Sequence, residues 1–514
     1  MKYFLTLIQL WVGFLSICAS YPKANIWIIP SVESPQVYRN YAQTSKVHLE
    51  MARGEVEHIQ LVFPSKVNEE YRFTFDRNLK GIQISARELK KMNGYYDALV
   101  PFKNQLKCTD TLTAVWITVQ CPSRVPVGKY HQTIKIEGSK HFTIQLDYNV
   151  HHTTIPLKSS IPITVGVENR CMTECLNDKE ADKERQRWVD FVLSYRMTPV
   201  FGTQITPERW QYEHSFSPWA WNDKRSIRLL NDRRYSCYML PFFTLSENEL
   251  ASLLCNIQKK GKLKESLFYI WDEPAYMEDY EQIKRKVNII RKYASDARIL
   301  TTFFCGPRNG PRKGDLYAVF DYLKHHIHVA TISLAPCKGN EEEVQHIRYK
   351  VPEGIDWWSY VCWQPGGNEP NFLLQMKGIQ QRAIMWRTWK NGSQGFLYWN
   401  CNIYHKRNPF TYITDMPHGD GILIYPGDIL GCKGPIASAR LERWRDGAEE
   451  MELLRLVEKN YSKEKADTLL NIVYSSPLSF IEKAHNIPFF RKELLDQLDK
   501  TIPIDYKLRI TDFI

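Results

Sequence analysis

The sequence lacks the motifs of several enzyme and binding classes. It has no CxxC pair and no HExxH motif, and the cluster His325-His326-Ile327-His328 is better explained as a surface turn, so we predict no metal and no cofactor. Gly392-Ser393-Gln394-Gly395 is not a nucleophile elbow and no phosphate-binding glycine loop occurs, which argues against a serine hydrolase. The formal net charge is +11, but basic residues form no long block, so nucleic acid is not an expected partner.

Only the N-terminus contains a long apolar run. Residues 1–20 combine Lys2, an apolar stretch and the small residues before Tyr21, a pattern that predicts a secretory signal peptide. We therefore expect an exported protein, in the periplasm, on the cell surface or secreted. Residues 15–18 resemble an imperfect lipobox, so membrane attachment is expected only if Cys18 carries a lipid. No later run of about 18 uninterrupted apolar residues predicts a membrane span.

Eleven cysteines follow the predicted signal peptide, an odd number that cannot all pair within the chain. Several lie in apolar strand-like runs, and a chain of this length does not need disulfides to stabilise its core. The sequence therefore predicts mainly buried thiols, with one or two bridges allowed.

The chain contains two long regions with different patterns of apolar and polar residues. Residues 21–155 contain short alternating apolar and polar segments separated by turns, which predict a β-sandwich domain. Residues 156–460 alternate eight strand-like runs with helix-like stretches, the pattern of a (β/α)8 barrel. Residues 461–514 predict a short helical C-terminal extension with an extended tail. The predicted barrel strands are 161–167, 198–201, 237–243, 267–271, 298–304, 329–334, 355–363 and 394–399, and the clearest helices are 179–194, 247–258, 276–292 and 373–389, with a closing helix in 436–459.

Two adjacent carboxylates, Asp272 and Glu273, follow the fourth predicted strand and precede Pro274. Barrel enzymes place catalytic groups at the carboxyl ends of their strands. Neighbouring carboxylates repel, which raises one pKa and leaves the other group ionised, as an acid and a charge stabiliser require. Because Pro274 favours an extended preceding residue, we expect Glu273 at the strand exit. The alternative is that the pair caps the helix predicted just downstream.

Aromatic residues end the seventh and eighth predicted strands and belong to the same rim. Flat rings bind the apolar faces of sugars, although about half of the residues in each strand must pack inside the barrel or against helices. We choose Tyr360 and Trp399 as substrate-binding residues, with Trp358 and Asn400 behind them.

These motifs together resemble glycoside hydrolase family 123 and its bacterial relatives with an N-terminal β-sandwich. The resemblance runs from about residue 50 to 456 and rests on Ala52–Glu55, Val125–Tyr130, Trp271–Pro274, Trp358–Tyr360, Pro370–Phe372, Gly395–Trp399, Gly419–Gly421, Tyr425–Gly427, Arg440–Glu442 and Arg445–Gly447. It implies a retaining exo-β-N-acetylgalactosaminidase that uses the substrate's 2-acetamido group as nucleophile. Its partner would be a glycan or glycoconjugate with a terminal β-linked N-acetylhexosamine. The implied roles are Glu273 as acid and base, Asp272 as acetamido stabiliser, Tyr360 as hydrogen-bond donor to the acetamido oxygen and Trp399 as a wall of the subsite.

Two alternatives remain open at this stage. A conventional retaining glycosidase needs a second carboxylate about 5 Å from the acid, and Glu369 after the seventh strand is the candidate for sugars without an acetamido group. Loop carboxylates are, however, more often solvated than catalytic. The other alternative is a glycan-binding protein without activity, against which the retained Asp272–Glu273 pair argues.

Overall fold

The alternating segments of the N-terminal region form two packed five-stranded sheets, as predicted. The structure is a computed structural model that describes residues 26–76, 81–206, 209–211, 231–240, 246–311, 313–405, 407–412 and 418–501, so the predicted signal peptide and extended tail lie outside it. One sheet has the order β1-β3-β8-β5-β6 and the other β2-β10-β9-β4-β7, with β2 and β10 parallel. The strands are β1 (Trp27–Pro30), β2 (Lys46–Arg53), β3 (Glu55–Pro64), β4 (Glu70–Phe75), β5 (Gln83–Met92), β6 (Tyr95–Pro101), β7 (Gln105–Lys107), β8 (Leu112–Cys121), β9 (Gly128–Glu137) and β10 (His141–Thr154).

Burial along β3 and β10 explains how the sandwich meets the rest of the chain. Strand β10 alternates buried and exposed residues because only one face points into the sandwich core. Strand β3 is buried on both faces, since Leu61 packs within the sandwich and Val62 packs in the core shared with the barrel. Strand β10 continues through Thr154, and His151 within it is paired with Glu50 at 2.7 Å.

The second region forms a nearly closed barrel in which all eight predicted strands occur. Seven parallel ladders join them in the order β12-β11-β19-β18-β17-β16-β15-β14, and β13 pairs antiparallel with β12 at one edge. Strands β12 and β14 lie beside each other at the seam. The strands are β11 (Ile163–Glu168), β12 (Thr198–Thr206), β13 (Arg209–Gln211), β14 (Tyr238–Leu240), β15 (Ser266–Trp271), β16 (Arg298–Phe303), β17 (Val329–Ser333), β18 (Asp356–Val361) and β19 (Phe396–Tyr398).

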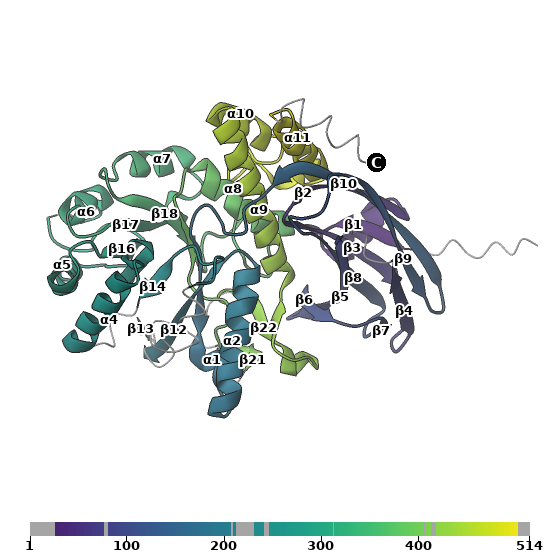
Figure 1. Cartoon of the computed structure of the whole chain (residues 1–514), viewed down its shortest axis with the longest axis horizontal. Coiled ribbons are helices and arrows are strands. Elements are labelled where there is room, and N and C mark those ends of the chain that lie inside the picture. The colour runs from purple at the N-terminus through teal and green to yellow at the C-terminus, as the bar shows by residue number, and fades with distance from the viewer. Residues whose placement is uncertain are drawn as a thin grey trace, which may run out of the picture.

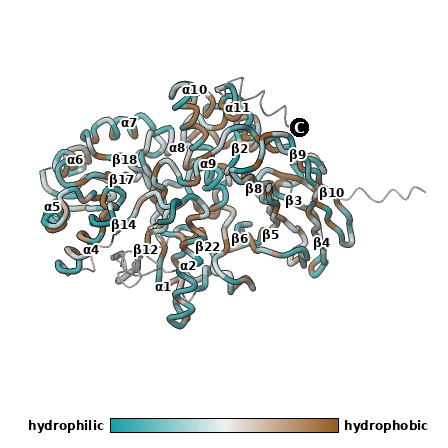
Figure 2. Tube along the Cα trace, viewed as in Figure 1, coloured by the Kyte–Doolittle hydropathy of each residue, from teal (hydrophilic) through white to brown (hydrophobic). Residues whose placement is uncertain are grey.

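Amphipathic helices cover the outside of the barrel (Figure 1). In α5, Tyr280, Ile283, Val287 and Ile290 recur at helical spacing and are buried, so apolar and polar residues alternate along the outer helices (Figure 2). The described α-helices and 3-10 turns of this region are α1 (Asn169–Thr173), α2 (Asp178–Ser194), α4 (Glu247–Lys259), η2 (Leu263–Glu265), α5 (Met277–Tyr293), α6 (Leu316–Leu323), η3 (Ala335–Cys337), α7 (Glu341–Tyr349) and α8 (Gly378–Lys390).

Helix α8 begins later than the sequence predicts, at Gly378 instead of Leu373. The Gln380 side chain accepts the backbone N–H of Lys377 at 3.0 Å, which caps the helix there, and Leu374 N–H donates to the carbonyl of His418 at 3.1 Å. The short strands β20 (Tyr404–His405), β21 (Asn408–Tyr412), β22 (Ile424–Pro426) and β23 (Pro435–Ala437) and the turn η4 (Gly427–Leu430) follow the barrel.

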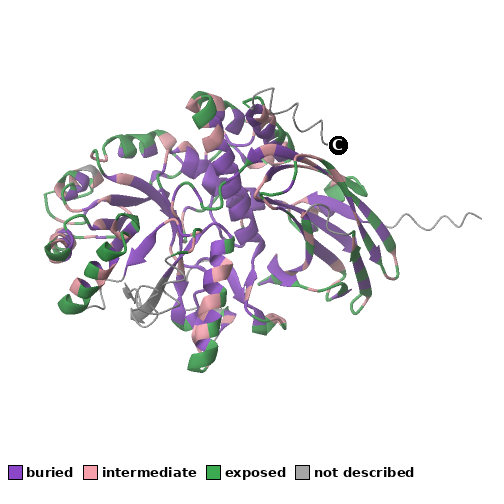
Figure 3. Cartoon of the chain, in the orientation of Figure 1, coloured by how far each residue is buried: buried purple, intermediate pink, exposed green. Residues whose placement is uncertain are grey.

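Helix α9 (Ala439–Asn460) lies between the barrel and the sandwich, and every residue from Ala439 to Leu454 is buried (Figure 3). The sequence predicts an apolar stripe docked on the barrel. The charged side of the helix is buried as well, because the sandwich covers it. The C-terminal helices α10 (Lys463–Leu470) and α11 (Ile487–Asp499), with η5 (Ile481–Asn486) between them, pack beside α9 and β10.

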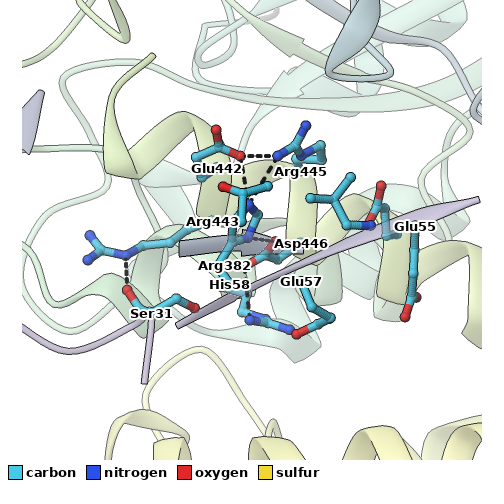
Figure 4. Close-up of polar contacts among 12 residues, drawn as sticks. Ser31, Glu55, Glu57, His58, Arg382, Glu442, Arg443, Arg445 and Asp446 are labelled. Atoms are coloured by element: carbon cyan, nitrogen blue, oxygen red, sulfur yellow. Dashed lines mark hydrogen bonds and ion pairs between the residues drawn. The ribbon is translucent and has the colours of Figure 1, made fainter. Parts of the chain in front are cut away.

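A network of buried ion pairs joins the sandwich to α8, α9 and α11 (Figure 4). The Arg382 guanidinium binds Asp446 at 3.0 Å and Glu450 at 2.6 Å. His58 of β3 contacts Asp446 at 2.8 Å and Glu442 at 3.1 Å. Arg491 of α11 pairs with Glu55 at 2.6 Å and Glu57 at 2.9 Å, so residues from both ends of the chain share this interface.

Candidate active site

The carboxylates of Asp272 and Glu273 lie at the carboxyl end of β15, on the rim that the sequence predicts, and both residues are exposed. The sequence predicts an extended backbone at Glu273, but its φ of 43° lies in the left-handed region. A left-handed glutamate costs roughly 1–3 kcal/mol and persists only where its surroundings hold it. Here its backbone N–H donates to Thr302 Oγ1 at 2.9 Å, and the N–H of Arg308 donates to the carbonyl of Ala275 at 2.7 Å.

Two hydroxyls fix the Asp272 carboxylate. Its Oδ1 accepts hydrogen bonds from Tyr269 at 2.6 Å and from Thr302 at 2.7 Å. Thr302 therefore donates to Asp272 and accepts from the backbone of Glu273, so one side chain of β16 sets the relative position of the two acids. Two hydroxyl donors on one oxygen fix the direction in which the Asp272 carboxylate points. Sequence reasoning missed Tyr269 and Thr302, because nothing in an isolated strand identifies the hydroxyl that faces a neighbouring strand.

Glu273 is suited to donate a proton. Although the residue as a whole is exposed, the surrounding barrel partly encloses its carboxyl group, and this partial desolvation and the nearby Asp272 charge raise its pKa above the usual value, while Tyr360 and Arg308 act in the opposite direction. The Tyr360 hydroxyl donates to Oε1 of Glu273 across 87 residues of sequence. Burial, followed by the charge of Glu273, keeps the pKa of Tyr360 well above 10, so the tyrosine remains a donor. The structure thus brings Asp272, Glu273 and Tyr360 together.

Strand β18 supplies a column of side chains to the barrel interior. Trp358, Tyr360 and Cys362 belong to one apolar cluster with interior residues of the other strands. Burial, with the charges of Asp420, Glu273 and Asp272, raises the pKa of Cys362 to about 12, so its thiol stays protonated and is not a nucleophile. Trp358 is 1% exposed, beneath Tyr360 in this column, and its ring fills the space beside Gly395.

Trp399 follows the last residue of β19 and is partly exposed. Its indole Nε1–H donates to Oδ1 of Asp420 at 3.0 Å, and the hydroxyl of Tyr398 donates to the same oxygen at 3.1 Å. Asn400 is buried, and its side-chain oxygen accepts the N–H of Asn402 at 2.9 Å. Trp358 and Asn400 therefore present almost no surface, whereas Trp399 does.

Glu369 is buried and paired, not solvated. Its Oε2 binds Arg387 of α8 at 2.9 Å, and Arg387 also binds Glu341 at 2.7 Å. Burial raises the pKa of Glu369, and Arg387 opposes this change. Glu369 is therefore paired with α8, and through Arg387 it is linked to Glu341 of α7, so its partners belong to the outer helices.

All eleven cysteines after the predicted signal peptide are free thiols, so the bridges allowed by the sequence do not form. Within the described ranges, no group of three or more side chains has the composition of a metal site. No helix in the same ranges is long and apolar enough to cross a membrane.

A near-closed parallel barrel with two carboxylates on its carboxyl-terminal rim is an arrangement that glycoside hydrolases use. The model of the glycoside hydrolase 123 catalytic domain matches residues 183–457, more than half of the sequence. The chain belongs to glycoside hydrolase family 123. This confirms the family that the sequence motifs resemble, and the barrel with its preceding β-sandwich is confirmed with it.

One solved structure shares this fold over the length of the chain. A family 123 glycoside hydrolase from Clostridium perfringens, studied for glycolipid glycan hydrolysis, is 14% identical with a TM-score of 0.65, covering 95% of this chain and 100% of that one. A Bacteroides ovatus GH5 xyloglucanase is 9% identical with a TM-score of 0.24, covering 79% and 98% of the two chains. A β-D-glucuronidase from Dictyoglomus thermophilum is 9% identical with a TM-score of 0.32, covering 79% and 71%. No curated protein matches the sequence.

Proposed function

We propose that this family 123 glycoside hydrolase is a retaining exo-β-N-acetylgalactosaminidase that uses substrate-assisted catalysis. The observation that carries the proposal is the division of roles between the two acids. Asp272 is held by two hydroxyl donors, whereas Glu273 has a raised pKa. In substrate-assisted catalysis the acetamido nucleophile must be oriented, and the aglycone must receive a proton as it leaves. An oriented carboxylate meets the first need and a neighbouring protonated acid meets the second.

In the first step, Glu273 gives its proton to the glycosidic oxygen while the substrate's acetamido oxygen bonds to the anomeric carbon. The aglycone leaves as an alcohol, and the sugar becomes an oxazolinium ion whose N–H is held by ionised Asp272. In the second step, Glu273 takes a proton from water, which attacks the same carbon and reopens the ring with retained configuration.

Two other side chains complete the proposed subsite. Tyr360 donates to Glu273 in this structure, so a bond to the acetamido oxygen requires its hydroxyl to turn when sugar binds. Trp399 offers its partly exposed ring as a wall, with Trp358 and Asn400 supporting the rim from below. The substrate would be a glycan with a terminal β-linked N-acetylhexosamine. The Clostridium perfringens relative was studied for glycolipid glycan hydrolysis, so a glycolipid glycan is a candidate substrate here as well.

The ion pair of Glu369 supports this mechanism over double displacement. A carboxylate committed to Arg387 would have to leave a buried partner before it could attack a sugar. We also propose that residues 1–20 direct export, to the periplasm, the cell surface or the medium, with a membrane anchor only if Cys18 is lipidated. Mass spectrometry of the mature N-terminus tests this part.

The decisive experiment is hydrolysis of chromogenic β-galactosides and β-glucosides, each with and without a 2-acetamido group. Cleavage confined to acetamido sugars, with loss of activity in Asp272→Asn, supports the proposal and identifies the configuration. Cleavage of plain sugars that depends on Glu369 would instead support double displacement. Binding without cleavage of any of the four would support the glycan-binding alternative.

A further inference from the structure

A buried acid beside the proposed subsite has a role that the catalytic steps do not use. We infer that Asp420 is a positioning residue that holds the Trp399 ring in place as a wall for the sugar. This inference rests on the proposed function, because it takes the exposed part of Trp399 as sugar-binding surface. Asp420 itself is 1% exposed, and its unpartnered Oδ2 is buried, so the residue does not contact substrate directly.

The contacts of Asp420 connect it to the rim. Its Oδ1 accepts the Trp399 indole N–H at 3.0 Å, which fixes the direction of the ring. The charges of Asp420, Glu273 and Asp272 all raise the pKa of Cys362, which follows strand β18. A buried carboxylate with one idle oxygen is costly, and such a group is retained where it holds something else in place.

The turn that carries Asp420 is itself rigid. Arg440 of α9 donates to the carbonyls of Gly419 and Phe372, each at 2.7 Å, and pairs with Asp97 of the sandwich at 2.9 Å. Gly421 has a φ of 67°, and a Cβ there would come within 2.6 Å of the Trp399 ring. The ring is therefore held at two places: Asp420 accepts the hydrogen bond from Nε1, and Gly421 packs closely against the edge of the six-membered ring.

The same carboxylate oxygen provides an internal control. Tyr398 donates to Oδ1 at 3.1 Å, almost the same distance as Trp399. Its ring, however, faces the outer core, 4.9 Å from Phe372 and 6.0 Å from Trp444 between ring centroids. Removing the Tyr398 hydroxyl takes one hydrogen bond from Asp420 and the acceptor of the Gly421 N–H at 2.9 Å, but it leaves the bond between Trp399 and Asp420 in place.

The test compares Asp420→Ala, Asp420→Asn, Trp399→Phe and Tyr398→Phe on the acetamido glycoside that the wild type cleaves. Losing one hydrogen bond to a charged group corresponds to a change of roughly tenfold, and we expect it in KM with little change in kcat for Asp420→Ala and Trp399→Phe. The double variant Asp420→Ala/Trp399→Phe should show no larger increase in KM than either single variant, because both substitutions remove the same hydrogen bond. Asp420→Asn keeps an acceptor oxygen and should stay close to wild type, as should Tyr398→Phe.

Additive KM effects in the double variant, or an equal KM increase in Tyr398→Phe, would overturn the inference. A second readout separates this failure from failure of the proposed function. The indole N–H signal that Trp399→Phe removes should exchange with solvent at least tenfold faster in Asp420→Ala, whether or not the protein cleaves any glycoside. Unchanged exchange would overturn the positioning role, whereas cleavage of no glycoside by the wild type would overturn the proposed function alone.

Discussion

Carboxylates at the domain interface and at the barrel rim differ in both burial and hydrogen-bond partners. At the interface, Glu55, Glu57, Asp446 and Glu450 each lie within about 3 Å of an arginine and are removed from water. At the rim, Asp272 and Glu273 are exposed, adjacent in sequence and held mainly by hydroxyl groups. At the interface an arginine offsets the cost of burying a carboxylate, whereas at the rim a hydroxyl orients an acid and leaves its proton available.

Replacing the acid at the rim should give the largest effect on function and almost none on folding. We expect Glu273→Gln to lower kcat by about 10²–10⁴-fold, because the amide keeps the shape of the side chain but cannot supply a proton at neutral pH. Steady-state kinetics and thermal melting measure the two consequences. A large decrease in melting temperature would mean that Glu273 also stabilises the fold.

Removing a cation from the domain interface should have a large effect on folding stability and little effect on function. Arg491→Ala leaves Glu55, Glu57 and Glu450 without a shared partner and should cost about 3–5 kcal/mol of unfolding free energy. Urea denaturation measures the change. The neighbouring Lys492→Ala is the control, because its pair with Asp496 is exposed and should contribute little. Equal stability of the two variants would contradict the distinction between these sites.

A smaller effect is expected where the Thr302 hydroxyl joins the two acids of the rim. Thr302→Val removes the donor to Asp272 and the acceptor for the N–H of Glu273, and should lower kcat/KM by about 10–100-fold. Thr301→Val is a matched control on the same strand, because the Thr301 hydroxyl is buried without a hydrogen-bond partner. Similar losses in both variants would show that packing, and not the bridging bonds, matters.

The pH dependence of activity should report the raised pKa of Glu273. The acid works only while protonated, so kcat/KM should fall as pH rises through a value above 4.5. Tyr360→Phe removes a donor that stabilises the carboxylate and should move this falling limb to higher pH. Arg308→Gln should move it in the same direction by less, since the arginine is the weaker influence. A shift to lower pH in either variant would contradict the assignment.

Much of the architecture could be predicted from sequence because it follows from local periodicity. All eight barrel strands and the exit position of Glu273 were predictable from apolar runs and a proline. The left-handed backbone of Glu273 was not, since it depends on Thr302 from another strand. Trp358 is buried because strand alternation turns it into the barrel, and Asp420 was missed because its importance depends on a tryptophan 21 residues away. Contacts between distant segments mark the limit of prediction from pattern alone.

The ion pair between Arg491 and Glu55 joins residues that are 436 positions apart. During synthesis the N-terminal sheet leaves the ribosome long before its counterion exists. Its acidic face must stay hydrated until α11 emerges, so the interface on α9 is complete only after α11 has left the ribosome. A nascent chain that stops before α11 should therefore carry an open interface that chaperones and proteases can recognise.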